Sequence, residues 1–272
     1  AGVSEDGEDQ KDALEHSVFA IPDIPGKVEH VDFSASGGEI GVRGVVSPAS
    51  SSFHANAVGG VRLDPGDADE VIEQVQQHFG SRGCAYQWFF APERATPTDL
   101  SARLERAGIA KAGEAAGLYI TDFDVEAEPN PSIEVIEVRG ADGVQDLLTV
   151  FTNGFPIPAE VASLIVDWQA ALGGRNYVAY LDGQPISAAV MFAMPDKPIA
   201  VFQGAATLPD HRGNGAYSAL LDRRLRDAAD WGMEAAILQA DRETSAPICT
   251  AYGFHELIDL VFHVWQPDPS LS

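Results

Sequence analysis

Six consecutive residues in the second half of the chain combine a permanent positive charge with two closely spaced glycines: Arg212, Gly213, Asn214, Gly215, Ala216 and Tyr217. Glycines separated by one residue allow a tight backbone turn, so that the amides can approach a ligand closely. The arginine offers a forked donor that suits phosphate oxygens. A helix that begins here would add free N–H groups and the positive end of its dipole. These six residues therefore predict a pyrophosphate-binding loop.

A strand before this loop and a helix after it must hold the loop in place. Ile199 to Phe202 is apolar and β-prone, and Pro209 ends that strand. The small residues Gly204 to Ala206 leave room for a ligand beside the strand. Helical spacing then defines one buried face, which is formed by Ala216, Ala219, Leu220, Leu225, Ala228 and Ala229.

Strand, loop and helix together resemble the coenzyme A site of the GNAT superfamily of acetyl-CoA-dependent N-acyltransferases. The family loop reads Arg/Gln-x-x-Gly-x-Gly/Ala, and Arg212 and Gly215 match it, whereas Tyr217 stands at the last, small position. The predicted order over residues 132–265 also resembles a GNAT domain: strand, two helices, strands, loop, helix, strand, helix, strand. The resemblance implies an α/β fold, with a mixed, mostly antiparallel sheet flanked by helices.

The resemblance also implies where a coenzyme would bind. In the family, the strand before the loop splays and offers backbone N–H groups to the thioester and the pantetheine. These contacts correspond to Ala205, Ala206 and Thr207, and the pyrophosphate contacts to Arg212 through Tyr217. Acetyl-CoA is therefore the expected acetyl donor. The two cysteines have no metal-ligand spacing, and no metal is expected.

Acetyl transfer from a thioester to an amine needs a neutral amine, donors for the oxyanion and a proton for the departing thiolate. Many family members donate that proton from a tyrosine in the pattern A-x-x-Tyr-x-x-x-Gly-Phe. Here Cys249 occupies the tyrosine position, and a thiol is ordinarily more acidic than a phenol. Ser245, Tyr252 or water could replace it as the donor. The structural alternative is that Cys249 is a small buried hydrophobic residue.

No residue stands out as the general base. Gln203 cannot be one, although it could orient a water, and Asp241 is a candidate carboxylate beside the cleft. Deprotonation of the amine through water would need no dedicated base. Trp168 and Phe155 would line the acceptor pocket or belong to the core.

The first half contains a weaker echo of the second. Residues 84–123 run strand, helix, strand, as do residues 234–265. The helix that precedes residues 84–123 begins at residues 64–70, where the second half has its glycine loop, but this start carries carboxylates and no arginine. These carboxylates would repel phosphate. We expect two tandem GNAT-like halves, of which the first has no coenzyme loop; an unrelated α/β domain is the alternative. The expected domains are a flexible or partly ordered lead (1–37), a degenerate half (38–124), a linker (125–131) and an acetyl-CoA-binding half (132–266).

The composition limits the possible partners. The 272 residues carry a net charge of −24, with 17 Lys and Arg. Such an acidic chain repels nucleic acids and anionic membranes, so neither is expected as a partner. The acid is spread along the sequence, which favours a surface suited to a salt-rich cell interior over an acidic cleft for a cationic amine. Two distant cysteines fit a reduced, cytoplasmic protein.

The sequence thus predicts an N-acetyltransferase that moves an acetyl group from acetyl-CoA directly to a primary amine of a small molecule or peptide. A monomer or homodimer is expected. The alternative is a non-catalytic acyl-CoA-binding or regulatory module, because Cys249 replaces the tyrosine and no base is apparent. A dinucleotide-binding protein is disfavoured, since its glycine loop would lie early in a parallel βαβ unit.

Overall fold

A computed structural model describes residues 7–35 and 38–267 of the chain. The chain forms two compact units, and each unit is assembled from two separate stretches. Unit 1 comprises residues 1–14 and 116–257, and unit 2 comprises residues 15–115 and 258–272. Among the described residues, no helix has the length and apolar character needed to cross a membrane.

Unit 1 is built on a mixed, mostly antiparallel sheet. Its strands are the end of β5 (Ala110–Ile120), β6 (Ile133–Glu137), β7 (Arg175–Leu181), β8 (Gln184–Ala193), β9 (Ile199–Val201), β10 (Ala205–Thr207) and β11 (Ala235–Ala240). The β6–β7, β7–β8, β8–β9, β8–β10 and β11–β5 pairs are antiparallel, and only β9 and β11 are parallel. This sheet confirms the predicted α/β architecture.

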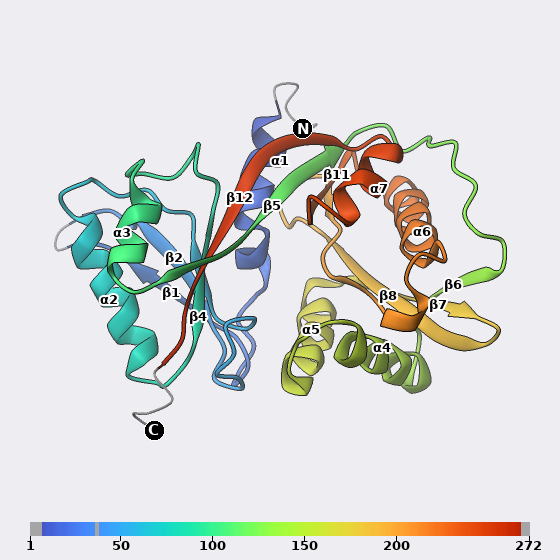
Figure 1. Cartoon of the computed structure of the whole chain (residues 1–272), viewed down its shortest axis with the longest axis horizontal. Helices are drawn as coiled ribbons and strands as arrows, with labels where there is room; N and C mark the ends of the chain where they lie inside the picture. Colours follow the sequence, from blue (N-terminus) through green and yellow to red (C-terminus); the bar gives the residue numbers. More distant parts are fainter. Residues whose placement is uncertain (1–6, 36–37, 268–272) are drawn as a thin grey trace. The chain divides into compact units, whose positions relative to one another are not determined.

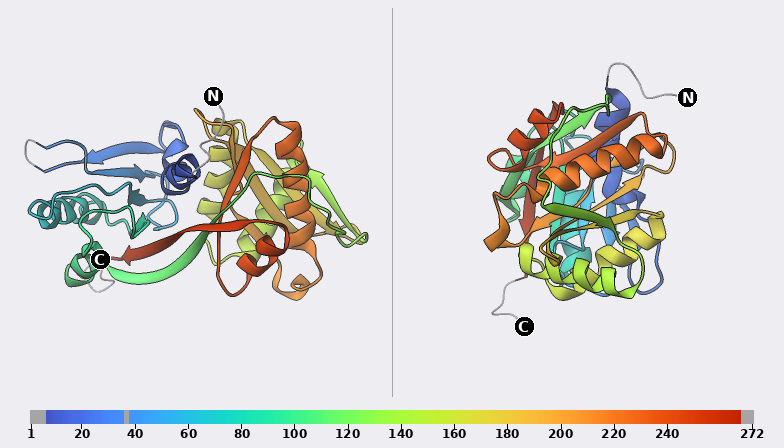
Figure 2. Two further views of the ribbon diagram at one scale, coloured as in Figure 1. Left: turned by 90° about the horizontal axis from the view of Figure 1, so that it is seen from above. Right: turned by 90° about the vertical axis from the view of Figure 1, so that its right-hand side faces the viewer.

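Helices cover both faces of the unit 1 sheet. They are α4 (Ala141–Gly154), α5 (Ala159–Leu172), α6 (Ala216–Asp230) and α7 (Ser245–Ala251). In Figure 1 and in the right view of Figure 2, α4 and α5 lie on one face, and α6 lies on the other. One buried cluster, including Phe151 and Val190, joins α4 and α5 to the sheet, and a second, including Tyr177 and Leu220, joins α6 and α7 to it.

The buried face of α6 follows most of the spacing read from the sequence. Ala229 was expected on this face but is exposed, because it lies one position beyond the buried row that ends at Ala228, whereas Leu221 is buried although it was not expected there. Ala216, Leu220 and Ala228 recur at intervals of four or eight residues and are at most 2% exposed. The same row contains Arg224, which is 1% exposed. The apolar pattern fixes how the helix lies on the sheet, and it carries this arginine into the interior.

Unit 2 contains a smaller sheet with its own core. Its elements are the last two residues of α1 (Glu8–His16), a 3₁₀ turn (Ser17–Ala20), β1 (Glu29–Phe33), β2 (Val42–Val46), β3 (Ala57–Gly59), α2 (Ala68–Gly80), β4 (Tyr86–Phe90), α3 (Leu100–Arg106), the start of β5 and most of β12 (His255–Trp265). β1, β2 and β3 are antiparallel neighbours, β3 and β4 are parallel, and β4 pairs antiparallel with β12.

The two units repeat one motif and exchange one strand. In unit 2 the helix α2 connects the parallel strands β3 and β4, just as α6 connects β9 and β11 in unit 1. The strand that follows β4 and α3 is β5, and its end pairs with β11. The strand that follows β11 and α7 is β12, and its end pairs with β4. The structure thus has two GNAT-like halves, and their last strands are reciprocally exchanged.

This exchange changes the expected domain limits. The bounds 38–124 and 132–266 assume that each half is contiguous, whereas residues 116–120 lie in unit 1 and residues 258–265 lie in unit 2. The acidic linker at residues 125–131 therefore lies within unit 1. A strand bonds to whichever sheet edge is open to it, and an apolar strand pattern does not identify that edge.

The lead expected at residues 1–37 contains regular structure. Residues 8–12 form the start of α1. The Lys197 ammonium pairs with Asp9 at 2.9 Å and with Asp12 at 3.0 Å, while Ala13 and Leu14 are buried. Residues 1–6 and 36–37 of the expected lead lie outside the described residues. Strand β1 was not predicted, because its first two residues are exposed and polar.

Candidate functional site

The strand before the glycine loop changes partners in its middle. The Phe202 amide, just after β9, donates to the Ile237 carbonyl of β11 at 2.9 Å. This is the last hydrogen bond between the β9 segment and β11. Gly204 then adopts a φ of +51°, and its carbonyl accepts from Val190 of β8 at 3.1 Å. β10 continues along β8 alone, so it diverges from β11.

The register of β10 decides which of its amides are available. In an antiparallel pair, residues that bond the neighbour alternate with residues that face away. Gly204 and Leu208 bond β8, and Ala206 lies opposite Ala188 in the same phase. Ala205 and Thr207 therefore direct their N–H groups away from β8, toward the side left open by β11. Of the three expected contacts, Ala206 is the one whose amide faces the neighbouring strand instead.

Two further contacts fix β10 against the rest of unit 1. The buried Ser187 hydroxyl donates to the Ala206 carbonyl at 2.7 Å and lies 2.7 Å from the Thr207 hydroxyl. The end of α4 also approaches β10, since a Cβ on Gly154 would lie 3.0 Å from the Ala206 Cβ. Gln203 lies in the bulge between β9 and β10 and is partly exposed.

The glycine loop joins β10 to α6 and leaves its amides free. Gly213 and Gly215 have φ values of +79° and +84°, which other residues adopt only with strain. Within the described residues, the amides of Gly213, Asn214 and Gly215 donate to no acceptor. The first residues of α6, Ala216 and Tyr217, add amides that lack intrahelical acceptors. The loop therefore presents a row of donors at the positive end of a helix dipole.

The linker supports this loop. The Asn130 side-chain amide donates to the Asn214 carbonyl at 2.9 Å. The Cβ of Asn130 is also 3.4 Å from the place that a Cβ on Gly215 would occupy. Asn130 was assigned only to the linker, and no signal in the sequence indicates this contact.

Arg212 is exposed and reaches back across the end of β10. Its Nε lies 3.4 Å from the Thr207 carbonyl, and its Nη2 lies 3.4 Å from the Gly154 carbonyl. Both distances exceed those of strong hydrogen bonds, so the guanidinium keeps donors for an anion.

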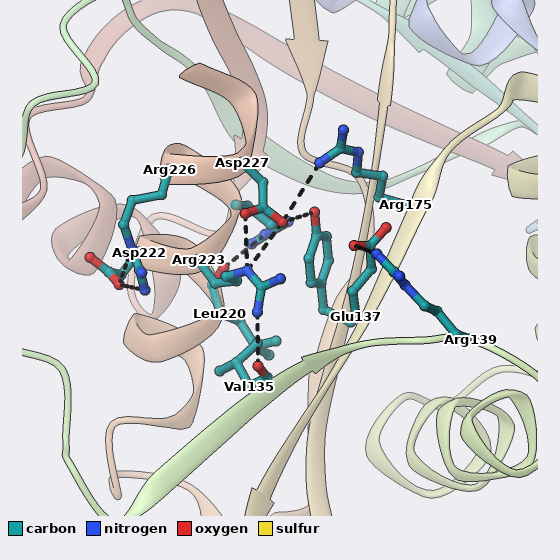
Figure 3. Close-up of polar contacts among 11 residues, drawn as sticks. Val135, Glu137, Arg139, Arg175, Leu220, Asp222, Arg223, Arg226 and Asp227 are labelled. Carbon is teal, nitrogen blue, oxygen red and sulfur yellow. Dashed lines mark hydrogen bonds and ion pairs between the residues drawn. The ribbon is translucent and has the colours of Figure 1, made fainter. Parts of the chain in front are cut away.

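A polar network attaches α6 to β6 and β7 (Figure 3). The Arg223 Nε donates to Asp227 at 3.0 Å, and its Nη1 donates to the Val135 carbonyl at 3.0 Å. The buried Tyr177 phenol donates to the same Asp227 carboxylate at 2.8 Å. Arg175 lies 3.8 Å from that carboxylate. The helix that carries the loop is thus bonded to both strands.

The predicted proton-donor candidates lie in different environments. Cys249 is fully buried, and its Sγ lies 3.3 Å from the Tyr217 phenol. Burial raises the pKa of the Cys249 thiol, while the Tyr217 contact and the Arg224 charge oppose that increase. Tyr217, expected only as a pyrophosphate contact, therefore extends toward the predicted donor position. Tyr252 is 9% exposed, and it lies instead beside Ser218 of α6.

Asp241 lies in the turn before α7 and contacts Ser245, the first residue of that helix. The Asp241 amide donates to the Ser245 hydroxyl at 3.0 Å. The Asp241 carboxylate accepts from the Thr244 hydroxyl and from the amides of Thr244 and Glu243, and these bonds lower its pKa. A carboxylate used in this way is a weak base, so the geometry favours a structural role for Asp241.

Arg224 is the residue of this region that the sequence reading missed. It lies between Tyr217, Cys249 and the Phe202 ring, whose centroid is 4.7 Å from its Cζ. A signal was present, because an arginine in the row Ala216, Leu220, Arg224, Ala228 is a charge at a predicted buried position. Among the described residues, no group of three or more His, Cys, Asp or Glu could hold a metal.

Comparisons with known proteins agree with this geometry. Residues 143–254 match the model of the acetyltransferase (GNAT) family. A GCN5-related N-acetyltransferase from Kribbella flavida is 15% identical, with a TM-score of 0.67 over 94% of this chain and 96% of that chain. One from Sphaerobacter thermophilus is 14% identical, with a TM-score of 0.61 over 86% and 84%. A search of curated proteins found no match.

A third solved structure has the same duplicated organisation. It is a tandem GNAT protein from the clavulanic acid biosynthesis pathway, 13% identical, with a TM-score of 0.58 over 97% of each chain. The family match supports acyl transfer as the class of reaction. Residues 143–254 therefore match the acetyltransferase (GNAT) family, and the chain as a whole has the fold of GCN5-related N-acetyltransferases with two GNAT-like halves.

Proposed function

We propose that the protein is an N-acetyltransferase that moves an acetyl group from acetyl-CoA directly to a primary amine of a small molecule or peptide. The observation that supports this proposal is the position of the glycine loop at the end of a strand that diverges from its neighbour. The free N–H groups of Ala205 and Thr207 suit an extended, amide-bearing chain. The loop amides suit phosphates at one end of that chain. Acetyl-CoA has both features in one molecule.

Replacement of Arg212 tests the loop. We expect Arg212→Glu to weaken acetyl-CoA binding by about tenfold or more, because a phosphate-binding cation becomes an anion. Calorimetric titration at low and high salt measures the affinity. Arg139→Glu is the matched control, since it changes the charge equally at a side chain that is 84% exposed. Equal affinities of the two variants would contradict the loop assignment.

A non-catalytic acyl-CoA-binding or regulatory module is the second candidate. The complete burial of Cys249, at the expected position of a proton donor, favours it. Release of free thiol from acetyl-CoA in the presence of a panel of primary amines separates the two candidates. An enzyme releases one thiol for each amine acetylated, whereas a binding module releases none.

We also propose a cytoplasmic setting without nucleic acid or membrane partners. Cys84 and Cys249 are both free thiols, as a reducing compartment favours. The net charge of −24 opposes association with polyanions.

A further inference from the structure

Arg224 is a buried cation that pairs with no carboxylate among the described residues. Its Nε donates to the Leu220 carbonyl at 3.3 Å, and its Nη1 donates to the Val190 carbonyl at 3.4 Å. Both acceptors are neutral and both bonds are long, so they balance only part of the charge. Burial lowers the pKa of Arg224, yet arginine keeps its proton in proteins. An anion that formed beside this guanidinium would be strongly stabilised.

The charge lies next to the point where the strands diverge. Val190, which accepts from Arg224, donates its own amide to Gly204 in the bulge. Phe202, whose ring lies 4.7 Å from the guanidinium carbon, makes the last bond to β11. The guanidinium is therefore placed beside the segment that we assign to the thioester.

Three side chains with acidic protons surround Arg224, and one of them is committed elsewhere. They are Tyr177, Tyr217 and Cys249. The Tyr177 phenol donates to Asp227, so its proton is held by a carboxylate. Tyr217 and Cys249 contact each other at 3.3 Å, where either atom can donate, and the Tyr217 hydroxyl also has a side-chain hydrogen-bond interaction with Arg224. Burial raises the pKa of the Tyr217 phenol, and the neighbouring guanidinium opposes this increase.

The Tyr217 phenol and the Cys249 thiol differ in burial and in their distance along the chain from the glycine loop. Cys249 has no exposed surface and lies in the middle of α7. Tyr217 is the last residue of the loop and lies in the first turn of α6, and it is partly exposed. A ligand that enters between β10 and β11 therefore meets the phenol before the thiol.

If the proposed acetyl transfer is correct, we propose that Tyr217 protonates the coenzyme A sulfur as the acetyl group leaves, and that Arg224 stabilises the resulting phenolate. The carbon–sulfur bond of the tetrahedral intermediate breaks, its electron pair passes to sulfur, and the sulfur takes the phenol proton. The proton lost by the amine nitrogen restores the phenol. One proton thus passes from nitrogen to sulfur in each turnover, and Cys249 positions the phenol.

A binding experiment tests this assignment without any acceptor amine. Calorimetric titration with coenzyme A and with desulfo-coenzyme A, in buffers of different ionisation enthalpy at about pH 8, gives the protons released on binding. A donor and a nearby cation stabilise the thiolate, so the wild type is expected to release more protons with coenzyme A. Tyr217→Phe is expected to lose most of that difference. An unchanged difference in Tyr217→Phe would overturn the assignment while leaving the proposed function intact.

Kinetics provide the second test. Loss of a general acid lowers kcat by about 100-fold or more, so Tyr217→Phe should show that loss with a KM for acetyl-CoA within about threefold of the wild type. Tyr180→Phe is the matched control, because it removes a phenol that donates to Asp146, and it should leave kcat unchanged. Cys249→Ala should cost less than Tyr217→Phe. The reverse order would transfer the role to Cys249.

Arg224→Met separates a functional arginine from a structural one. Replacing an uncompensated buried charge with an apolar side chain of similar length tends to preserve or raise stability. The variant is therefore expected to unfold at the same or a higher urea concentration, yet to show a lower kcat. A loss of stability with an unchanged kcat would show that Arg224 is structural. If the wild type binds no coenzyme A, the proposed function and this inference both fail.

Discussion

At the scale of single residues, the clearest test of the fold is the carboxylate of Asp227. It accepts from the buried Tyr177 phenol and from Arg223, and its side chain is 13% exposed (Figure 3). We expect Asp227→Ala to lower the free energy of unfolding by about 2–4 kcal/mol, because a buried phenol and a half-buried guanidinium lose their acceptor. Urea unfolding of the purified variant measures this change.

The same helix provides a control for that measurement. Asp222 pairs with Arg226 one turn along α6, and the Arg226 side chain is 65% exposed. The Asp222 side chain is 13% exposed, as that of Asp227 is, but its partner lies in solvent. A pair with one solvent-exposed partner contributes less than about 1 kcal/mol, so Asp222→Ala should cost much less than Asp227→Ala. Similar losses in the two variants would mean that the Tyr177–Asp227 bond adds little to the attachment of α6.

The sequence predicts single residues unevenly. That the loop from Arg212 to Tyr217 binds pyrophosphate stays a prediction. The turn at its two glycines, Gly213 and Gly215, was predicted from residue type and spacing, because glycine conformation is a local property. The approach of Tyr217 to Cys249 was not, because it depends on how two helices 32 residues apart in sequence meet over one sheet. Arg224 was partly predictable. Its position in the helical repeat of α6 predicts burial, but only the structure shows that it pairs with no carboxylate among the described residues.

At the scale of elements, the site depends on the register of β10. The Leu208 amide bonds Ile186, and Ala206 has the same phase, whereas Ala205 and Thr207 face the open side. Amide hydrogen exchange should therefore be slow at Ala206 and Leu208 and fast at Ala205 and Thr207. Among these four amides of β10 and its end, acetyl-CoA should slow exchange only at Ala205 and Thr207. Nuclear magnetic resonance of the free and bound protein resolves the four amides.

Uniform protection along β10 would contradict this register, and a further slowing of exchange at Ala206 on binding would show that Ala206 is a coenzyme contact after all.

The divergence of the strand was expected from the family resemblance, but the alternation of its amides was not. A one-residue shift in pairing reverses which amides face outward, and three small residues in a row do not specify that shift. The register is set by partners elsewhere, including the hydroxyl of Ser187.

At the scale of the molecule, the most consequential feature is the exchange of β5 and β12. The two halves were predicted from repeated element order, and this part of the prediction is confirmed. The exchange could not be predicted, because β5 and β12 each mix apolar and polar residues without a feature that selects one sheet over the other. Pairing of β11 with β5 and of β4 with β12 makes each unit depend on a strand from the other half.

This dependence predicts how fragments behave. Residues 125–272 alone retain the glycine loop, but they lack β5 beside β11 and β4 beside β12. Exposed sheet edges and an unpaired apolar strand favour aggregation, so we expect this fragment not to fold in isolation. Co-expression with residues 1–124 should yield a soluble one-to-one complex, measured by size-exclusion chromatography and circular dichroism.

The control is the intact protein, cut after folding at a protease site inserted at the exposed Glu128, and its two fragments should stay associated. A fragment 125–272 that folds alone, with the thermal midpoint of the whole chain, would show that the exchanged strands contribute little to stability.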